Sequence, residues 1–176
     1  MDFLEDNKIP LGGVIEDFIT FLRDHADWLF DFISRVLEFL IDGMIEILLF
    51  VPPLLLIALI AGFAWWLHRS LWLVVGCVLS LLLVINLGYW EETIETLALV
   101  ICATLFCMAI GVPIGIAAAH RPRLYAALRP VLDLMQTLPT FVYLIPAIVF
   151  FGIGMVPGLI ATVIFVLPAP IRLTCL

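Results

Sequence analysis

The fold is decided by residues 134–171, which read LMQTLPTFVYLIPAIVFFGIGMVPGLIATVIFVLPAPI. No charged side chain occurs over these 38 residues. The run is too long for one bilayer crossing, since a transmembrane helix needs about 20 apolar residues. A Gly/Pro cluster at residues 152–157 divides it, because such clusters favour turns. We therefore expect two membrane spans in this stretch.

Three further uncharged runs precede it, at residues 47–67, 71–90 and 96–119. Of the 176 residues, 65% are hydrophobic and 13% charged, whereas a soluble domain would be about half apolar and a quarter charged. Spans in lipid must satisfy their own backbone polar groups, and these runs lack the alternation of barrel strands. The sequence therefore predicts an all-α, polytopic membrane helical bundle of about five transmembrane helices.

An amphipathic helix is expected before the first span. Apolar residues recur with helical spacing from Val14 through Ile15 and Phe18 to Leu40, and acidic residues occupy the opposite face. Residues 1–43 hold ten acidic and three basic side chains, which account for the whole net charge of −7. We divide the chain into an acidic amphipathic external segment, residues 1–43, and a transmembrane domain, residues 44–176. The helix has three possible positions: on the outer membrane surface, against the rest of the chain, or against a soluble partner.

Pro52-Pro53 stands near the start of the first expected span. Proline cannot sit in an undisturbed helix interior, because it lacks the N–H group and clashes with the preceding turn. Either the surface helix ends here and the span begins with the prolines, or the span is kinked. The sequence leaves both possibilities open.

The orientation of the chain is predicted from its basic residues. Those after residue 43 are Arg69, Arg121, Arg123, Arg129 and Arg172. If Arg69 is inside, alternation of the spans puts all five on the inner side, as the positive-inside rule expects. The glutamates within residues 91–95 and the acidic N-terminal segment then lie outside. We also expect Trp65, Trp66 and Trp72, which flank Arg69, to be interfacial anchors.

Side chains that commonly carry chemistry form no catalytic constellation. The four cysteines include no CxxC pair, and the three histidines are far apart, so we expect no metal site. A phosphate-binding glycine loop is absent, so nucleotide hydrolysis would belong to another chain. No ionisable residue falls in the middle of an expected span, which disfavours ion coupling. We expect no catalytic residue, no cofactor and no nucleic-acid partner.

Two acidic groups have open interpretations. The glutamates at residues 91–95 either favour the positive N-terminal end of the following helix or attract a cation at a pore mouth. Asp133 has the same two interpretations at the start of the next span. Arg129, one turn earlier, is the neighbour that helical spacing suggests for it.

The segment DLMQTLPTFVYLIP, residues 133–146, is the most informative about function. Pro139 and Pro146 lie in one expected span, where each frees a backbone carbonyl and bends the helix. Irregular backbone at membrane depth is tolerated where it lines a cavity or is buried in protein. A bent span with polar side chains is therefore expected to face a pathway. The candidate pathway residues are Gln136, Thr137, Pro139, Tyr143 and Pro146.

These residues resemble the permease subunit of the proline/glycine betaine and choline ABC importers, a type I importer permease. The similarity lies in MQTLPTFVYLIP at 135–146, FGIGMVP at 151–157 and the segment from ATVIF to RLT at 161–174. The opening IPLG at 9–12 and the acidic amphipathic helix also look like that family. The resemblance extends over essentially the whole chain and is most specific between residues 130 and 174.

The resemblance implies a permease subunit for glycine betaine, proline betaine or choline in a bacterial inner membrane, with a periplasmic N-terminus and a cytoplasmic C-terminal end. The implied partners are a second permease copy, cytoplasmic ATPase subunits, a periplasmic substrate-binding protein and the lipid bilayer. Members of the family carry a cytoplasmic coupling loop beyond the position of Arg172, followed by further spans. Because the sequence stops at Leu176, we expect a C-terminally truncated form that does not transport by itself.

Two other functional classes stay open. The chain could be a non-transporting membrane scaffold or an inactive permease fragment, with the acidic helix docking a partner. A membrane-embedded enzyme is the weakest hypothesis, because no nucleophile–base pair or metal constellation occurs in the sequence.

Overall fold

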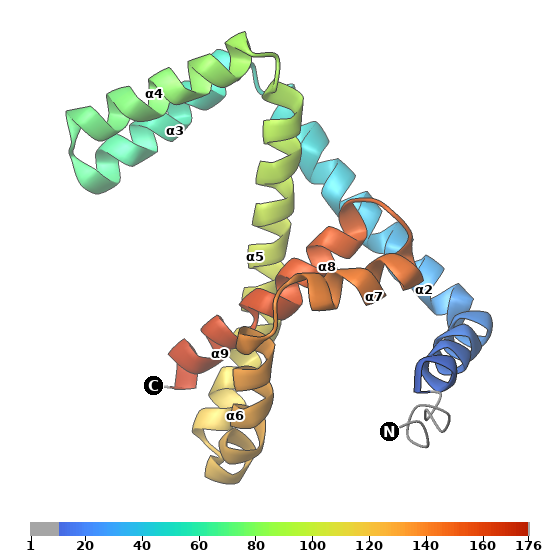
Figure 1. Ribbon diagram of the computed structural model, residues 1–176. Helices are drawn as coiled ribbons and strands as arrows, with labels where there is room; N and C mark the ends of the chain where they lie inside the picture. Colours follow the sequence, from blue (N-terminus) through green and yellow to red (C-terminus); the bar gives the residue numbers. More distant parts are fainter. Residues whose placement is uncertain (1–10, 176) are drawn as a thin grey trace, which may run out of the picture.

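The computed structural model describes residues 11–175, and within them all regular structure is helical (Figure 1). The first ten residues, including Ile9-Pro10 of the expected opening, and Leu176 lie outside the described residues. So do the side chains of Val14, Ile15 and Phe18. The expected all-helical class is confirmed. The helices are α2 (Leu11–Phe50), α3 (Pro53–His68), α4 (Leu71–Asn86), α5 (Trp90–Ala119), α6 (Pro122–Thr137), α7 (Phe141–Phe151), α8 (Met155–Val166) and α9 (Pro168–Cys175).

The two prolines after α2 end one helix and begin the next. α2 runs to Phe50, and Pro53 is the first residue of α3, where a missing N–H costs no intrahelical bond. The two helices meet at 95°. Of the two possibilities that the sequence left open, the helix end is the one found. α2 also continues without a break past residue 43, so the proposed domain boundary there stays a prediction.

The number of membrane spans differs from the simple count of apolar runs. Two helical segments, Trp90–Ala119 and Met155–Cys175, are long and apolar enough to cross a membrane singly. Up to four crossings result if the bent pairs α2–α3 and α6–α7 are each one span. The expected figure of about five treated residues 47–67 and 71–90 as full spans. The helices α3 and α4 have only 16 residues each, because the prolines and turns between helices use the remainder.

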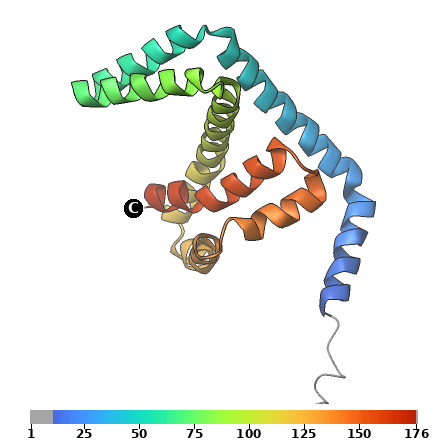
Figure 2. The same ribbon diagram turned by 45° about the horizontal axis from the view of Figure 1, so that its top comes forward.

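α5 is the central helix of the molecule, and α9, α8, α2 and α6 all pack against it (Figures 1 and 2). Small side chains make up most of its buried face, and they allow other helices to approach closely where lipid supplies no hydrophobic driving force. These small residues are Ala98, Cys102, Ala103, Cys107, Gly111, Gly115 and Ala118.

The closest approach is between α5 and α9, in a contact that we call the seam. A Cβ atom placed on Gly111 would lie 2.7 Å from Cγ of Pro170. One placed on Gly115 would lie 2.7 Å from Cβ of Thr174 and 2.8 Å from the carbonyl oxygen of Ile171. The seam therefore requires glycine at both positions, and it fixes α9 to α5 by shape.

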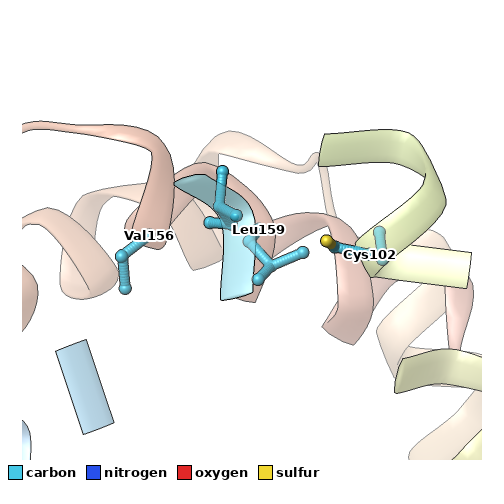
Figure 3. Packing of buried hydrophobic residues seen from close by; sticks show 5 residues of the cluster. Cys102, Val156 and Leu159 are labelled. Atoms are coloured by element: carbon cyan, nitrogen blue, oxygen red, sulfur yellow. The ribbon is translucent and has the colours of Figure 1, made fainter. Parts of the chain in front are cut away.

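A second contact joins α2, α5 and α8 through fully buried apolar side chains. Figure 3 shows Leu159 of α8 between Val156 and Cys102, with Cys102 coming from α5. Ile41 of α2 and Ala103 of α5 complete the cluster, and all five side chains are at most 4% exposed. α2 is thus held against the bundle by its own apolar face.

The α3–α4 hairpin is packed very differently. Its two helices contact each other, and the hairpin leaves the Trp90 end of α5 sideways, away from the other helices (Figures 1 and 2). Its surface is apolar and largely exposed, for example at Phe63, Trp66 and Trp72. Lipid is the surrounding that suits such a surface, because a soluble monomer rarely exposes a large continuous apolar patch.

Candidate functional site

The stretch predicted as one bent span is two helices that meet at 91°. α6 ends at Thr137 and α7 begins at Phe141, and we call the connection, residues 138–140, the elbow. Leu138 is extended, with φ −77° and ψ 136°, which is the conformation that a following proline favours. Pro139 therefore breaks the helix completely where the sequence suggested a bend.

The five predicted pathway residues lie along this α6–elbow–α7 segment. Gln136 and Thr137 are in the last turn of α6, Pro139 is in the elbow, and Tyr143 is in the first turn of α7. α7 continues through Pro146 to Phe151, so the break in the chain is at Pro139. Whether these residues contact a transported molecule stays a prediction.

Two hydroxyl groups at the elbow bond to the backbone. The Thr137 hydroxyl donates to the Leu134 carbonyl at 3.0 Å, within α6. The Tyr143 hydroxyl donates to the Met135 carbonyl at 3.1 Å, and this bond reaches from α7 back to α6. Gln136 is exposed. Two of the polar side chains that distinguish this segment in the sequence, Thr137 and Tyr143, therefore form hydrogen bonds with backbone carbonyls of the same segment.

An ion pair joins α6 to α9. Nη2 of Arg172 contacts Oδ1 of Asp133, with the two side chains 34% and 54% exposed. Helical spacing had suggested Arg129 as the neighbour of Asp133, and the structure instead supplies an arginine 39 residues away. Sequence reasoning could not find this partner, because it depends on how α9 packs on α5.

The glutamates near the start of α5 lie at the N-terminal end of the helix, as one of the two interpretations expected. Glu91 and Glu92 lie in the first turn, where a negative charge suits the helix dipole. The hydroxyls of Thr93 and Thr96 donate to backbone carbonyls one turn earlier, at 2.7 Å and 2.8 Å. An open cavity of about 530 Å³ adjoins this turn, lined by Tyr89, Glu92, Thr93, Thr96, Leu97 and Val100.

A second cavity, of about 420 Å³, lies between α2 and the end of α7. Asp27, Asp31 and Ser34 line it from α2. Phe30 also lines it, stacking on Phe150 with ring centroids 4.7 Å apart and meeting Phe151 edge-on at 5.5 Å. These aromatic contacts attach α7 to α2.

Within residues 11–175 no group of three His, Cys, Asp or Glu side chains could hold a metal ion. The four cysteines are free thiols. Cys107 points its sulfur at the Val163 carbonyl, 3.6 Å away, as a packing contact between α5 and α8.

Comparison with known proteins connects this geometry with transport. Residues 111–176 match the family described as binding-protein-dependent transport system inner membrane component. The chain is 40% identical over 169 residues to the glycine betaine transport system permease protein OpuAB of Bacillus subtilis (strain 168). The aligned residues cover 96% of this chain and 60% of the relative. This chain is a homologue of glycine betaine permeases. The resemblance read from the sequence is confirmed.

Two other relatives agree. The glycine betaine/carnitine transport permease protein GbuB of Listeria monocytogenes serotype 1/2a (strain 10403S) is 40% identical over 169 residues, which cover 94% of this chain and 60% of the relative. The glycine betaine/proline betaine transport system permease protein ProW of Escherichia coli (strain K12) is 38% identical over all 176 residues, 49% of its own length. The permease homologue thus spans between about half and 60% of the length of these relatives.

The segment that matches the transport family contains both glycines of the seam, the elbow, the five candidate residues in and around it, and α9. The Asp133–Arg172 ion pair also falls within it. This permease homologue is a multi-pass inner membrane protein by its relatives and by its long apolar helices.

Proposed function

We propose that this chain is a transmembrane permease subunit of an ATP-driven importer for glycine betaine, proline betaine or choline. The observation that carries the proposal is the 40% identity over 96% of the chain to a glycine betaine permease. The elbow supports the proposal, because a broken helix with polar side chains in an otherwise apolar bundle is typical of a transport pathway. Gln136, Thr137, Pro139, Tyr143 and Pro146 are the proposed pathway residues.

The proposed assembly contains a second permease copy, cytoplasmic ATPase subunits and a periplasmic substrate-binding protein. The matching family is a binding-protein-dependent transport system, which supports the substrate-binding protein as a partner. In this assembly ATP would be hydrolysed on the ATPase subunits, and the permease would alternate between outward-open and inward-open forms. The reaction of this chain is therefore movement of a solute, without a covalent step.

We propose further that the N-terminus is periplasmic and the C-terminal end cytoplasmic. The Asp133–Arg172 pair supports the placement of Arg172 and of α6 on the same side of the membrane. Arg121, which directly precedes α6, would lie on that side as well. The sideways hairpin gives Arg69 no such link, so its placement relies on the positive-inside rule alone. The orientation is tested by cysteines at Ile153, which is 96% exposed, and at Arg123, in a background without the native cysteines. A membrane-impermeant thiol reagent added to intact cells should label position 153 only, and the reverse pattern would overturn the orientation.

Uptake is the test of function. The product of the complete gene that encodes these residues would be reconstituted in liposomes with the ATPase subunits and the binding protein, with ATP enclosed on the ATPase side. We expect accumulation of labelled glycine betaine that requires both ATP and the binding protein. An ATPase variant that binds but does not hydrolyse ATP is the control. Assembly without uptake of any of the three compounds would overturn the proposal and favour a non-transporting scaffold.

A further inference from the structure

In the last turn of α6, next to the elbow, one backbone carbonyl loses its normal helical partner to a proline. In an α-helix the carbonyl of Met135 would accept the N–H of the residue four positions later. That residue is Pro139, which has no N–H. An unpaired carbonyl away from water is costly, so the site needs another donor.

Tyr143 supplies that donor. Its hydroxyl lies 3.1 Å from the Met135 carbonyl oxygen, and the bond is partly buried. The backbone bonds on either side stay local: the N–H of Leu138 donates to Leu134, and that of Val142 to Pro139. The side chain of Tyr143 therefore makes a connection between α6 and α7 that the backbone at the elbow does not.

This bond is specific to the bent state. If α6 and α7 formed one continuous helix, positions 135 and 143 would be separated by about 12 Å along the axis. A tyrosine hydroxyl does not reach back that far. The Met135 carbonyl would then have neither the tyrosine nor a backbone partner. A contact made in only one of two states shifts the population toward that state.

α6 is the more lightly held arm of the elbow. α6 packs against α5, has one buried residue among those described, Leu132, and reaches α9 through the exposed Asp133–Arg172 pair. α7 also has one buried residue among those described, Ala147, but it packs more extensively, on α8 and on α2, where Phe150 stacks on Phe30. A change of angle at the elbow would therefore move α6, together with the pathway candidates Gln136 and Thr137.

We propose that the elbow is a joint of the transport pathway and that Tyr143 is the positioning residue that holds it bent, by pairing with the carbonyl that Pro139 leaves open. The role in transport rests on the proposed function, whereas the hydrogen bond and its effect on the helix angle do not. Tyr143 acts through the Met135 carbonyl and need not touch the transported solute.

The test measures the angle directly. Spin labels on cysteines at Ala127 of α6 and Val149 of α7, both exposed, report the distance between the arms by pulsed EPR. The protein is the complete gene product in lipid nanodiscs, with the native cysteines replaced. We expect a dominant short distance, and Tyr143→Phe should raise the ratio of extended to bent molecules roughly fivefold. Tyr125→Phe, which removes a hydroxyl near the other end of α6, should leave the distances unchanged.

A second variant tests the pairing itself. Pro139→Ala restores an N–H that can serve the Met135 carbonyl in a continuous helix, so it should also increase the extended population. Adding Tyr143→Phe to Pro139→Ala should raise the ratio by about the same factor as it does alone, because the tyrosine bond belongs to the bent state with either residue at 139. Unchanged distances in both single variants would overturn the proposal. Shifted distances without betaine uptake in the reconstituted system would leave the joint standing and reject the proposed function.

Discussion

The seam and the elbow both contain a proline, yet the two prolines act in opposite ways. Pro170 of the seam lies in the first turn of α9, where an absent N–H leaves no intrahelical bond unmade, and its ring fills the space beside Gly111. Pro139 of the elbow follows a helix turn and leaves the Met135 carbonyl without its usual donor. The seam is held by close packing, whereas the bend at the elbow is held by one side-chain hydrogen bond.

This difference assigns the two regions different mechanical roles. A close-packed contact resists small displacements, because every neighbouring atom must move. A hydrogen bond contributes only about 1 kcal/mol net, so its loss changes a population without unfolding the protein. We infer that the α5–α9 unit is the rigid part against which α6 moves.

The largest effect is expected from adding one methyl group to the seam. Gly115→Ala would place Cβ 2.8 Å from the Ile171 carbonyl oxygen. Because this oxygen belongs to the backbone, it cannot relieve the clash by a side-chain rotation. We expect a loss of about 1–3 kcal/mol in the free energy of unfolding. Thermal unfolding of the purified protein in detergent, followed by intrinsic fluorescence, measures it.

Gly62→Ala and Gly76→Ala are matched controls, because a Cβ atom at either position meets nothing within 4 Å. Both glycines are inside helices of the hairpin, so alanine should leave stability unchanged or raise it by up to about 1 kcal/mol. If Gly115→Ala were as well tolerated as these controls, the seam would not be the rigid contact described here.

A smaller effect is expected at the ion pair that links the two regions. Asp133→Ala and Arg172→Ala should each destabilise the protein slightly, with a coupling energy of about 0.2–1 kcal/mol, because both side chains are substantially exposed. The measurement is a double-mutant cycle of unfolding free energies. Pairing Asp133→Ala with Arg129→Ala is the control, and these two changes should be additive within about 0.5 kcal/mol. Coupling to Arg129 instead of Arg172 would restore the pairing suggested by helical spacing.

The parts of the structure that were predictable are those set by local chemistry. Apolar length predicts the helices, and the 152–157 cluster predicts the turn before α8, whereas Pro52-Pro53 left open whether the helix ends or is kinked there. The pairing of Asp133 was not predictable, because Arg172 is brought to it by the glycine face of α5. Local spacing alone would have favoured the wrong arginine.

The elbow lies between these two cases. Proline at position 139 predicts a disturbed helix, and its orphaned carbonyl at Met135 can be named from the sequence by counting back four residues. That Tyr143 would bond to this carbonyl depends on the 91° angle, which packing against α8 and α2 sets. A tyrosine shortly after such a proline is nevertheless a signal worth testing in other spans.

The smallest effect on stability is expected at Trp72, which marks the extreme opposite to the seam. Its side chain is 88% exposed on the hairpin, so Trp72→Ala removes few protein contacts and should change the unfolding free energy by no more than about 0.5 kcal/mol. Its surroundings should instead be lipid at the membrane interface, where tryptophan is favoured. A variant that keeps Trp72 as its single tryptophan would be placed in bilayers with bromine on shallow or deep acyl positions. Stronger quenching by shallow bromines is expected. Protection from both would mean that protein covers the hairpin, and the exposed apolar surface would then be an interface between subunits rather than a lipid contact.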